Sequence, residues 1–264
     1  YDFDPQKDKI EYERLKRIDR YILFRLEELK KEVTVSYENF EFHIVYRRIY
    51  NFCNEDLSMR YLDMVKGRLY TQSKDSLERR CAQTTIYYIL DVLLRLLAPV
   101  LVFTCEEAYE HLPKLSSTSP SIHLCEWPKQ NPLFAQEDIK KELSVIMDLI
   151  PEVTLLLENL RGEDRIGSSF DAEIILLTKD NFYYKYLEDL KEELREIFRV
   201  SRVEIENTEA KEAYISKNHP QIAILARPAQ GKKCQRCWNY SLDVGEDKIY
   251  PSLCGRCIKI VRNI

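Results

Sequence analysis

Ile86-Tyr-Tyr-Ile-Leu-Asp-Val-Leu-Leu-Arg-Leu-Leu97 is the stretch that decides the fold of this chain of 264 residues. Its charged residues, Asp91 and Arg95, are four positions apart, the spacing at which opposite charges pair on a helix. A helix that is apolar on almost every side is normally central to a bundle. Asp75-Ser-Leu-Glu78 resembles a capping box, so we expect the helix to begin there and to break or bend at Pro99.

Apolar residues that recur three and four positions apart predict further helices around this central one. We expect them over residues 7–33, 40–60, 100–112 and 136–160, and we expect Pro151 to interrupt the last. The first 135 residues are therefore predicted to form a helical bundle that buries the central helix. The buried face of the second helix should carry Phe42, Val45, Ile49 and Phe52.

Later in the chain, short apolar runs replace the helical spacing. Residues 172–178, 202–206 and 221–227 have strand character and residues 181–198 look helical, which together predict a small α/β module. Gln230-Gly231 separates this module from a cysteine-rich tail. The predicted fold is mainly α. It consists of a helical domain, a helix with a small α/β connector, and a zinc-binding domain, over residues 1–135, 136–228 and 229–264.

The charge is unevenly distributed along the chain, whose net charge is −4. From Ala229 to Ile264, seven Lys and Arg stand against three Asp and Glu, so the tail carries +4 and the rest −8. A basic module on an acidic body indicates local attraction for an anionic partner. No uncharged apolar run reaches about 18 residues, so we expect no membrane span. The first residues, Tyr1-Asp-Phe-Asp-Pro5, include neither a signal peptide nor an initiator methionine, which favours a fragment of a longer protein.

The tail carries two cysteine pairs, Cys234-Gln-Arg-Cys237 and Cys254-Gly-Arg-Cys257, separated by sixteen residues. This spacing is typical of zinc ribbons. Four protein ligands leave no position for a reactive water, so one zinc ion here would be structural. It would supply folding energy that about thirty residues cannot obtain from a core. An iron site with the same ligands and a redox-active cysteine pair are the alternatives.

The remaining cysteines occur singly along the chain. This usage is typical of reduced cytosolic thiols, so we expect a cytoplasmic protein. The residues concerned are Cys53, Cys81, Cys105 and Cys125.

Arg236 and Trp238 flank Cys237 in the tail. A guanidinium can hydrogen-bond an unpaired base and an exposed indole can stack on it, which makes both residues candidate RNA contacts. An equally weighted alternative is that Trp238 packs inside the ribbon and that Arg236 is merely solvated. Lys232 and Lys233 add positive charge beside them.

Residues 51–70 interleave acids, bases and tyrosines. Lys66 and Arg68 are candidate RNA contacts in this segment, although a helix end held by internal ion pairs accounts for the pattern better. We predict no catalytic site, because the chain has no phosphate-binding loop or nucleophile motif and its histidines are scattered. These histidines are His43, His111, His123 and His219.

Several motifs along the first 130 residues form a recognisable set. They are Asp19-Arg-Tyr-Ile-Leu23, Phe52-Cys-Asn-Glu-Asp-Leu-Ser58, Lys66-Gly-Arg-Leu-Tyr70, Ala82-Gln-Thr-Thr-Ile-Tyr87 and Cys125-Glu-Trp-Pro128. This set resembles the anticodon-binding region of class I aminoacyl-tRNA synthetases of the Ile/Val/Leu group. The cysteine tail, with Cys234-Gln-Arg-Cys-Trp-Asn-Tyr240, resembles the C-terminal zinc domain of bacterial-type isoleucyl-tRNA synthetases.

The resemblance implies a C-terminal part that binds tRNA(Ile) at its anticodon region and holds one structural Zn²⁺. The parent enzyme, an isoleucine–tRNA ligase, would join isoleucine to its tRNA with ATP. The HIGH and KMSKS motifs of the family and its editing domain do not occur in the chain. We therefore expect this piece to be a monomer, without a membrane partner, that is inactive without those missing domains.

Three other interpretations stay open at the level of sequence. One is a zinc-stabilised helical scaffold for protein interactions. The second is a fragment of a valyl-type or leucyl-type synthetase. The third is a DNA-repair protein that ends in a four-cysteine finger.

Overall fold

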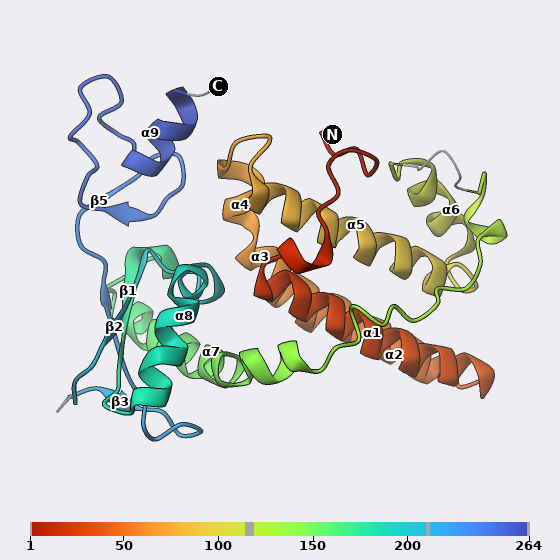
Figure 1. The fold of residues 1–264 in the computed structure, drawn as a ribbon, viewed down its shortest axis with the longest axis horizontal. Helices are drawn as coiled ribbons and strands as arrows, with labels where there is room; N and C mark the ends of the chain where they lie inside the picture. The colour runs from red at the N-terminus through yellow and green to blue at the C-terminus, as the bar shows by residue number, and fades with distance from the viewer. Residues whose placement is uncertain (1, 114–118, 210–211, 263–264) are drawn as a thin grey trace. The chain divides into compact units, whose positions relative to one another are not determined.

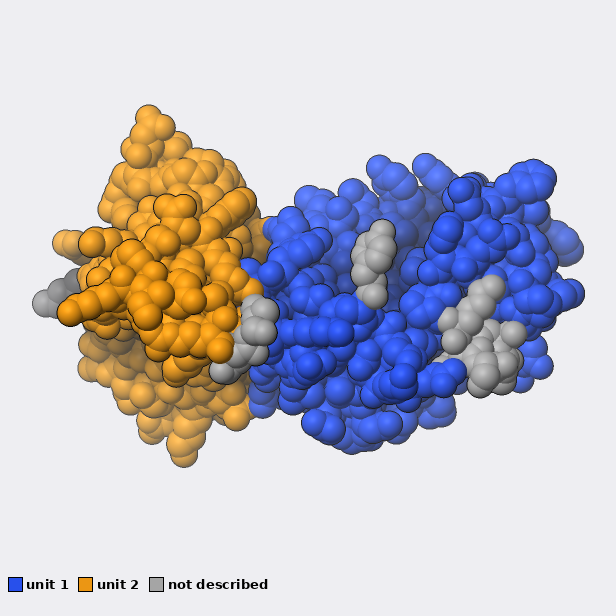
Figure 2. Space-filling view, turned by 90° about the horizontal axis from the view of Figure 1, so that it is seen from above, with its two compact units in different colours: residues 1–143 blue, residues 144–264 orange. Residues whose placement is uncertain are grey.

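The computed structural model describes residues 2–113, 119–209 and 212–262, and the chain divides into two compact units (Figure 2). The first unit is Tyr1–Leu143 and the second is Ser144–Ile264. The division lies within helix α7 (Asp138–Gly162). The three domains predicted from the sequence, with boundaries after residues 135 and 228, stay a prediction.

The first unit contains helices and, within its described residues, no strand (Figure 1). This agrees with the predicted helical bundle and with a mainly α fold. α1 packs against both α2 and α5, and α6 packs against α5. The longer helices are α1 (Arg17–Glu38), α2 (Phe42–Asn51), α5 (Leu77–Leu97) and α6 (Val102–Glu110). The shorter ones are η1 (Tyr12–Arg14), η2 (Phe52–Tyr61), α3 (Leu62–Met64), α4 (Lys66–Thr71) and η3 (Ile122–Leu124).

Helix α5 forms where the central helix was predicted. The hydroxyl of Ser76 accepts a hydrogen bond from the backbone N–H of Arg79 at 3.3 Å, which caps the helix. The helix ends two residues before Pro99, as expected. The predicted burial of Ile86–Leu97 holds for half of its ten apolar residues. Leu90 is 38% exposed, and the other four are half-buried: Ile86, Tyr87, Tyr88 and Leu97. The buried residues of that stretch are Ile89, Val92, Leu93, Leu94 and Leu96.

Two expectations about the helices were wrong, the start of α1 and the break at Pro151. α1 begins at Arg17 rather than at residue 7, because Lys16 is extended, with ψ 156°, and separates α1 from the preceding turn. α7 runs through Pro151 without interruption. The ring removes one backbone N–H, but the turns on both sides stay buried at Leu149 and Val153, and this packing outweighs the lost hydrogen bond.

The segment predicted as one helix over residues 40–60 is α2 followed by the π-helical segment η2. Val45, Ile49 and Phe52 are buried, as predicted. Phe42, the first residue of α2, is exposed instead, and its ring makes an edge contact with Tyr37, with ring centroids 6.1 Å apart.

The second unit is built on a four-stranded sheet in the order β2-β1-β4-β3. β1 is parallel to β2 and antiparallel to β4, and α8 (Asn181–Ile197) connects the parallel pair and packs on β2. The predicted strands and this helix are confirmed, whereas β3 was not predicted. The strands are β1 (Ala172–Leu177), β2 (Arg202–Glu206), β3 (Tyr214–Ile215) and β4 (Ala223–Pro228).

The tail adds a two-stranded sheet, β5 (Lys232–Lys233) with β6 (Tyr240–Ser241), and the helix α9 (Gly255–Arg262). Gly231 enters this sheet with φ +95°, and a Cβ atom there would lie 2.3 Å from the carbonyl oxygen of Ser241. Only glycine fits without a shift of the backbone. Across the described ranges, no helix combines the length and the apolar character that a membrane span requires.

Candidate metal centre and nucleic-acid interface

The four tail cysteines converge on one point. The Sγ atoms of Cys234, Cys237, Cys254 and Cys257 all lie within 4.8 Å of one another. The first pair lies on a turn that begins after β5, and a backbone hydrogen bond from Trp238 to the carbonyl of Cys234 closes it at 2.9 Å. The second pair lies at the start of α9, and the N–H of Cys254 donates to the Sγ of Cys234 at 3.3 Å. The structure thus brings together all four predicted ligands.

The spacing of the sulfurs fits a zinc ion. The Sγ atoms of Cys237 and Cys254 are 3.7 Å apart. Two ligands of a tetrahedral zinc with Zn–S bonds of about 2.3 Å are about 3.8 Å apart. A disulfide needs about 2.05 Å, and all four cysteines are free. Four thiolates complete the coordination of zinc, so the donor set is that of a structural site.

Positive side chains surround the cysteine cluster. A zinc ion with four thiolates carries a net charge of about −2, and Arg236 donates from Nη1 to the Sγ of Cys257 at 3.7 Å. Burial acts to lower the pKa of Arg256, but the charges of Cys237, Cys257 and Cys254 together with a hydrogen bond to Cys237 raise that pKa above its ordinary value. Burial lowers the pKa of Arg195 on α8, and the charge of Arg256 acts in the same direction. These guanidiniums offset the negative charge of the site.

Arg195 was missed by sequence reasoning. It lies on α8, about forty residues before the first cysteine pair, and no local motif connects the two. Arg236 was predicted as an RNA contact, and the structure adds a bond to a cysteine sulfur that the sequence did not indicate.

Trp238 points outward from the first cysteine turn. Its side chain is 63% exposed, so the alternative in which the indole packs inside the ribbon is wrong. Its φ of 62° lies in the left-handed region, which bulky residues seldom adopt. Because its N–H is bonded to the carbonyl of Cys234, the turn that carries the cysteines fixes this conformation. The indole face is therefore presented to solvent by a constrained backbone.

The predicted lysines differ in how they are held. Lys232 is exposed. The Nζ of Lys233 lies 2.9 Å from a carboxylate oxygen of Asp171 and 5.8 Å from the ring centroid of Tyr240. Lys66 belongs to the other unit, where its exposed Nζ bonds a carboxylate oxygen of Asp63 at 2.6 Å. Both ion pairs leave the lysines at the surface.

Arg68 requires a correction, because it is inside the bundle rather than on its surface. Its Nη1 lies 2.7 Å from Oδ2 of Asp19, which is completely buried, and the hydroxyl of Tyr61 donates to Oδ1 of the same carboxylate at 2.7 Å. Burial, together with the charge of Asp19, raises the pKa of Tyr61 well above its ordinary value. The internal ion pair expected as the simpler reading of residues 51–70 is present here, and Arg68 is not available to RNA.

Sequence reasoning also missed an exposed row of rings on α2, which we call the α2 aromatic stripe: Phe42, Tyr46 and Tyr50. The rings of Tyr46 and Tyr50 are stacked with centroids 5.8 Å apart. Arg47 is exposed beside them. The signal was the spacing of four between the three rings, out of step with the buried positions of the helix.

Two protein-family models match the chain. One, described as the anticodon-binding domain of tRNA ligase, matches residues 19–176. The other, described as a zinc finger found in FPG and IleRS, matches residues 231–260 and so includes all four cysteines. The match and the cysteine cluster together establish a structural zinc site in the tail.

Curated relatives of the chain are named isoleucine–tRNA ligase. Those of Natranaerobius thermophilus and Desulforamulus reducens are 39% identical over 267 and 263 residues, which cover 99% of this chain and 28% of each relative. That of Symbiobacterium thermophilum is 38% identical over 269 residues, covering 100% of this chain and 29% of the relative. The chain therefore spans less than a third of the length of these relatives.

Proposed function

This chain belongs to the family of anticodon-binding domains of tRNA ligases, and we propose that it binds the anticodon end of isoleucine tRNA for an isoleucine–tRNA ligase. The observation that carries the proposal is the exposed indole of Trp238 beside Arg236 on the turn of the zinc site. Anticodon bases are unpaired, so their faces can stack on an aromatic ring and their edges can accept hydrogen bonds from a guanidinium.

The charge of the tail supports the same conclusion. The tail carries +4, against −8 for the rest of the chain. Exposed Lys232 and the surface pair of Lys233 with Asp171 lie at the start of this basic segment. Phosphate attraction therefore favours the tail over the acidic remainder as the first point of contact with RNA.

The helical unit supplies a second candidate surface. The α2 aromatic stripe lies within the residues that match the anticodon-binding domain. Exposed tyrosine rings stack on bases with little sequence preference, and Arg47 adds a cation next to them. In this proposal the stripe contributes stacking alone, whereas the zinc tail contributes both a stacked base at Trp238 and contacts to base edges from Arg236.

Zinc has a supporting role in this function. We infer that Cys234, Cys237, Cys254 and Cys257 all bind the ion, which holds the turn that presents Trp238. The whole protein would attach isoleucine to its tRNA with ATP in the cytoplasm, acting as a monomer. The chain itself contains no HIGH or KMSKS motif. Pure chain should therefore show no isoleucine-dependent pyrophosphate exchange above background.

A filter-binding assay at physiological salt tests the proposal against its alternatives. We expect the full chain to bind isoleucine tRNA more tightly than a tRNA with another anticodon, and both more tightly than duplex DNA. Preference for valine or leucine tRNA would indicate a different synthetase. Preference for duplex DNA would indicate a DNA-repair protein, and no binding of any nucleic acid would favour a protein-interaction scaffold.

A further inference from the structure

The helical unit exposes a run of apolar residues where α5 gives way to α6. Pro99-Val-Leu-Val-Phe-Thr104 are six consecutive exposed residues without a charge, and the ring of Phe103 is 88% exposed. Single apolar side chains are common on protein surfaces, whereas a contiguous group of them marks a surface that another molecule covers. The run therefore indicates an interface.

The end of α1 extends this apolar surface. The hydroxyl of Tyr37 donates to the carbonyl of Leu96 at 2.9 Å, which holds the last turn of α1 beside the last turn of α5. Phe40 follows directly after α1 and is also exposed. We call the combined surface the bundle-end face: Phe40, Val100, Leu101, Val102 and Phe103.

The backbone at Phe40 is unfavourable for so large a residue. Its φ of 59° lies in the left-handed region, and the N–H groups of Phe40 and Glu41 bond back to carbonyls of α1 at 3.0 and 2.8 Å. Helices that end in this way usually have Gly or Asn at this position, because a Cβ atom is disfavoured there. The ring meets the edge of Phe42, with centroids 6.2 Å apart, but stays 78% exposed. Packing within the chain therefore offsets little of the cost, and we expect the ring to be covered in the whole protein.

The start of α6 adds a polar requirement to the same face. Its N-cap residue is Leu101, which offers no acceptor, and no side-chain cap hydrogen bond forms among the described residues. The first N–H groups of a helix need an acceptor from water or from a partner. A partner that supplies apolar side chains together with one carboxylate or carbonyl oxygen satisfies both requirements.

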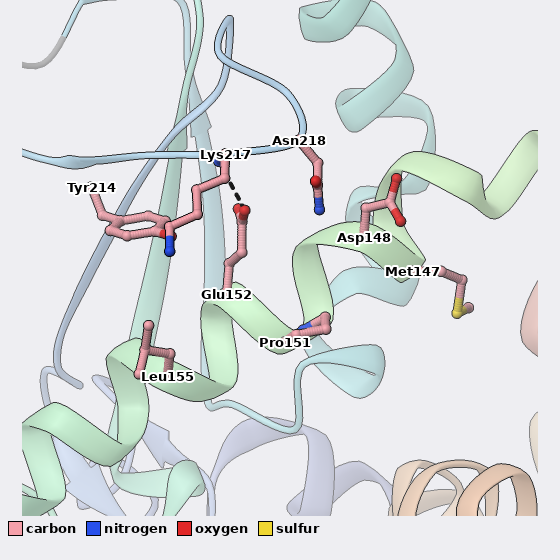
Figure 3. A pocket seen from close by; sticks show the side chains of 8 residues that line it. All are labelled: Met147, Asp148, Pro151, Glu152, Leu155, Tyr214, Lys217 and Asn218. Carbon is pink, nitrogen blue, oxygen red and sulfur yellow. Dashed lines mark hydrogen bonds between the residues drawn. The ribbon is translucent and has the colours of Figure 1, made fainter.

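The pocket of the second unit is a different kind of surface (Figure 3). It has a volume of about 330 Å³ and lies between α7 and the loop that follows β3. Its buried carboxylate, Glu152, already accepts a hydrogen bond from the backbone N–H of Lys217 at 2.8 Å. Asp148, on its wall, lies 3.2 Å from Nε2 of His219. These polar groups have partners within the chain and indicate no class of ligand.

The possible partners match the bundle-end face unequally. RNA is disfavoured, because residues 99–104 carry no cation to meet its phosphates. A second copy would bring another helix start that needs an acceptor, rather than the acceptor itself. The relatives named isoleucine–tRNA ligase extend over more than two thirds of their length beyond the matched region. A parent protein of that length tethers a large further surface to the bundle, at high effective concentration.

We propose that the bundle-end face docks the part of the parent protein that lies outside this chain, through a segment that covers Phe103 and places an acceptor at the start of α6. This inference rests on the proposed function, since it takes the parent to be a ligase as long as its relatives. Docking would fix the orientation of the bundle, so that binding at the anticodon end positions the rest of the tRNA for the reaction.

Thiol labelling of the full-length parent protein and of this chain tests the proposal. Thr104→Cys places a thiol at an exposed position inside the run, and Ser58→Cys places one at an exposed position of η2 as the matched control. Peptide mapping separates both from the native cysteines. We expect maleimide to label Thr104→Cys at least about tenfold more slowly in the parent than in the chain, because a covered thiol reacts only when the contact opens. Ser58→Cys should be labelled at the same rate in both.

Phe103→Ser measures what the face contributes. In the chain alone it should change neither the melting temperature nor the affinity for isoleucine tRNA, since the ring is exposed and lies outside the proposed RNA contacts. Combined with Thr104→Cys in the parent, it should return the labelling rate to that of the chain.

Three results would overturn the proposal. Equal labelling of Thr104→Cys in parent and chain would do so whether or not the chain binds isoleucine tRNA, so this failure is distinct from failure of the proposed function. Protection of Thr104→Cys in the chain by tRNA would assign the face to RNA. A chain that is dimeric by light scattering and becomes monomeric in Phe103→Ser would assign it to a second copy.

Discussion

The helical unit and the zinc tail of this chain remain folded for different reasons. The helical unit buries apolar residues from several helices, among them Leu23, Leu26 and Leu96, which are completely covered. The buried cluster of the tail consists of cysteines and one aliphatic residue, Val244. Apolar burial stabilises the first at about 25 cal/mol per Å², whereas metal binding stabilises the second. Each part can therefore lose its structure without the other.

The largest expected effect follows from removing one zinc ligand. Cys254→Ser should release the metal and unfold the tail, because zinc binding to structural sites contributes about 10–16 kcal/mol at pH 7. The helical unit should keep its circular dichroism signal, since its core contains no metal. Metal analysis and limited proteolysis measure the two parts separately.

Cys53→Ser is the control for this experiment, because Cys53 is a half-buried cysteine of the helical unit. It should retain one zinc per chain. A Cys254→Ser protein with an intact tail, or one whose helices melt together with the tail, would show that the two parts are not stabilised independently.

The second effect is the converse, a loss of stability confined to the helical unit. Arg68→Met removes the cation that faces completely buried Asp19, which should cost about 3–5 kcal/mol. Lys66→Met breaks only an exposed pair with Asp63 and should cost about 0–1 kcal/mol. Urea unfolding followed by helical circular dichroism measures both, and zinc content should not change in either.

A double variant, Asp19→Asn with Arg68→Met, should recover much of the loss, because the uncompensated charge is then absent. Equal losses in Arg68→Met and Lys66→Met would contradict the assignment of Arg68 to the bundle interior.

The difference between the two parts also explains what the sequence could predict. The cysteine spacing identified the metal cluster, because a C-x2-C turn determines its ligands locally. α5 was predictable from its apolar run, although the residue that caps it is Ser76 and the predicted capping box of Asp75 with Glu78 is not formed. The burial of Arg68 was not, because its partner Asp19 is 49 residues away and only the packed bundle brings them together.

Exposure was the property that the sequence determined least. Phe42 has the spacing of a core residue but lies at the first position of α2, outside the core. Trp238 was equally compatible with a packed and an exposed indole until the backbone conformation of its turn was known. Pro151 looked like a helix break because the packing of Leu149 and Val153 cannot be read from the local sequence.

The third effect compares the helical unit with the tail as RNA-binding surfaces. Tyr46→Ala removes a ring of the α2 aromatic stripe that is 69% exposed. Stacking is worth about 1–3 kcal/mol per base, so affinity for isoleucine tRNA should fall about fivefold to a hundredfold. The same variant should lose similar affinity for a non-cognate tRNA, because stacking reads little sequence. Unchanged affinity for both tRNAs would remove the stripe from the proposed interface.

Arg236→Ala separates two roles for the guanidinium in the tail. If it contacts phosphate, the slope of log Kd against log salt should decrease by about 0.7–0.9. If it contacts a base edge, preference for isoleucine tRNA should decrease instead, by about 1–3 kcal/mol. Loss of zinc would show that its bond to the sulfur of Cys257 is its main role.

The dissociation constant of isoleucine tRNA for Trp238→Ala, measured with its zinc content, tests the central claim most directly. The account predicts a chain that keeps one zinc and binds this tRNA about fivefold to a hundredfold more weakly, because one stacked base is lost. Ile249→Ala, which truncates another exposed apolar residue of the tail, should bind like the original chain. A Trp238→Ala protein that keeps its zinc and binds isoleucine tRNA with unchanged affinity would contradict the account.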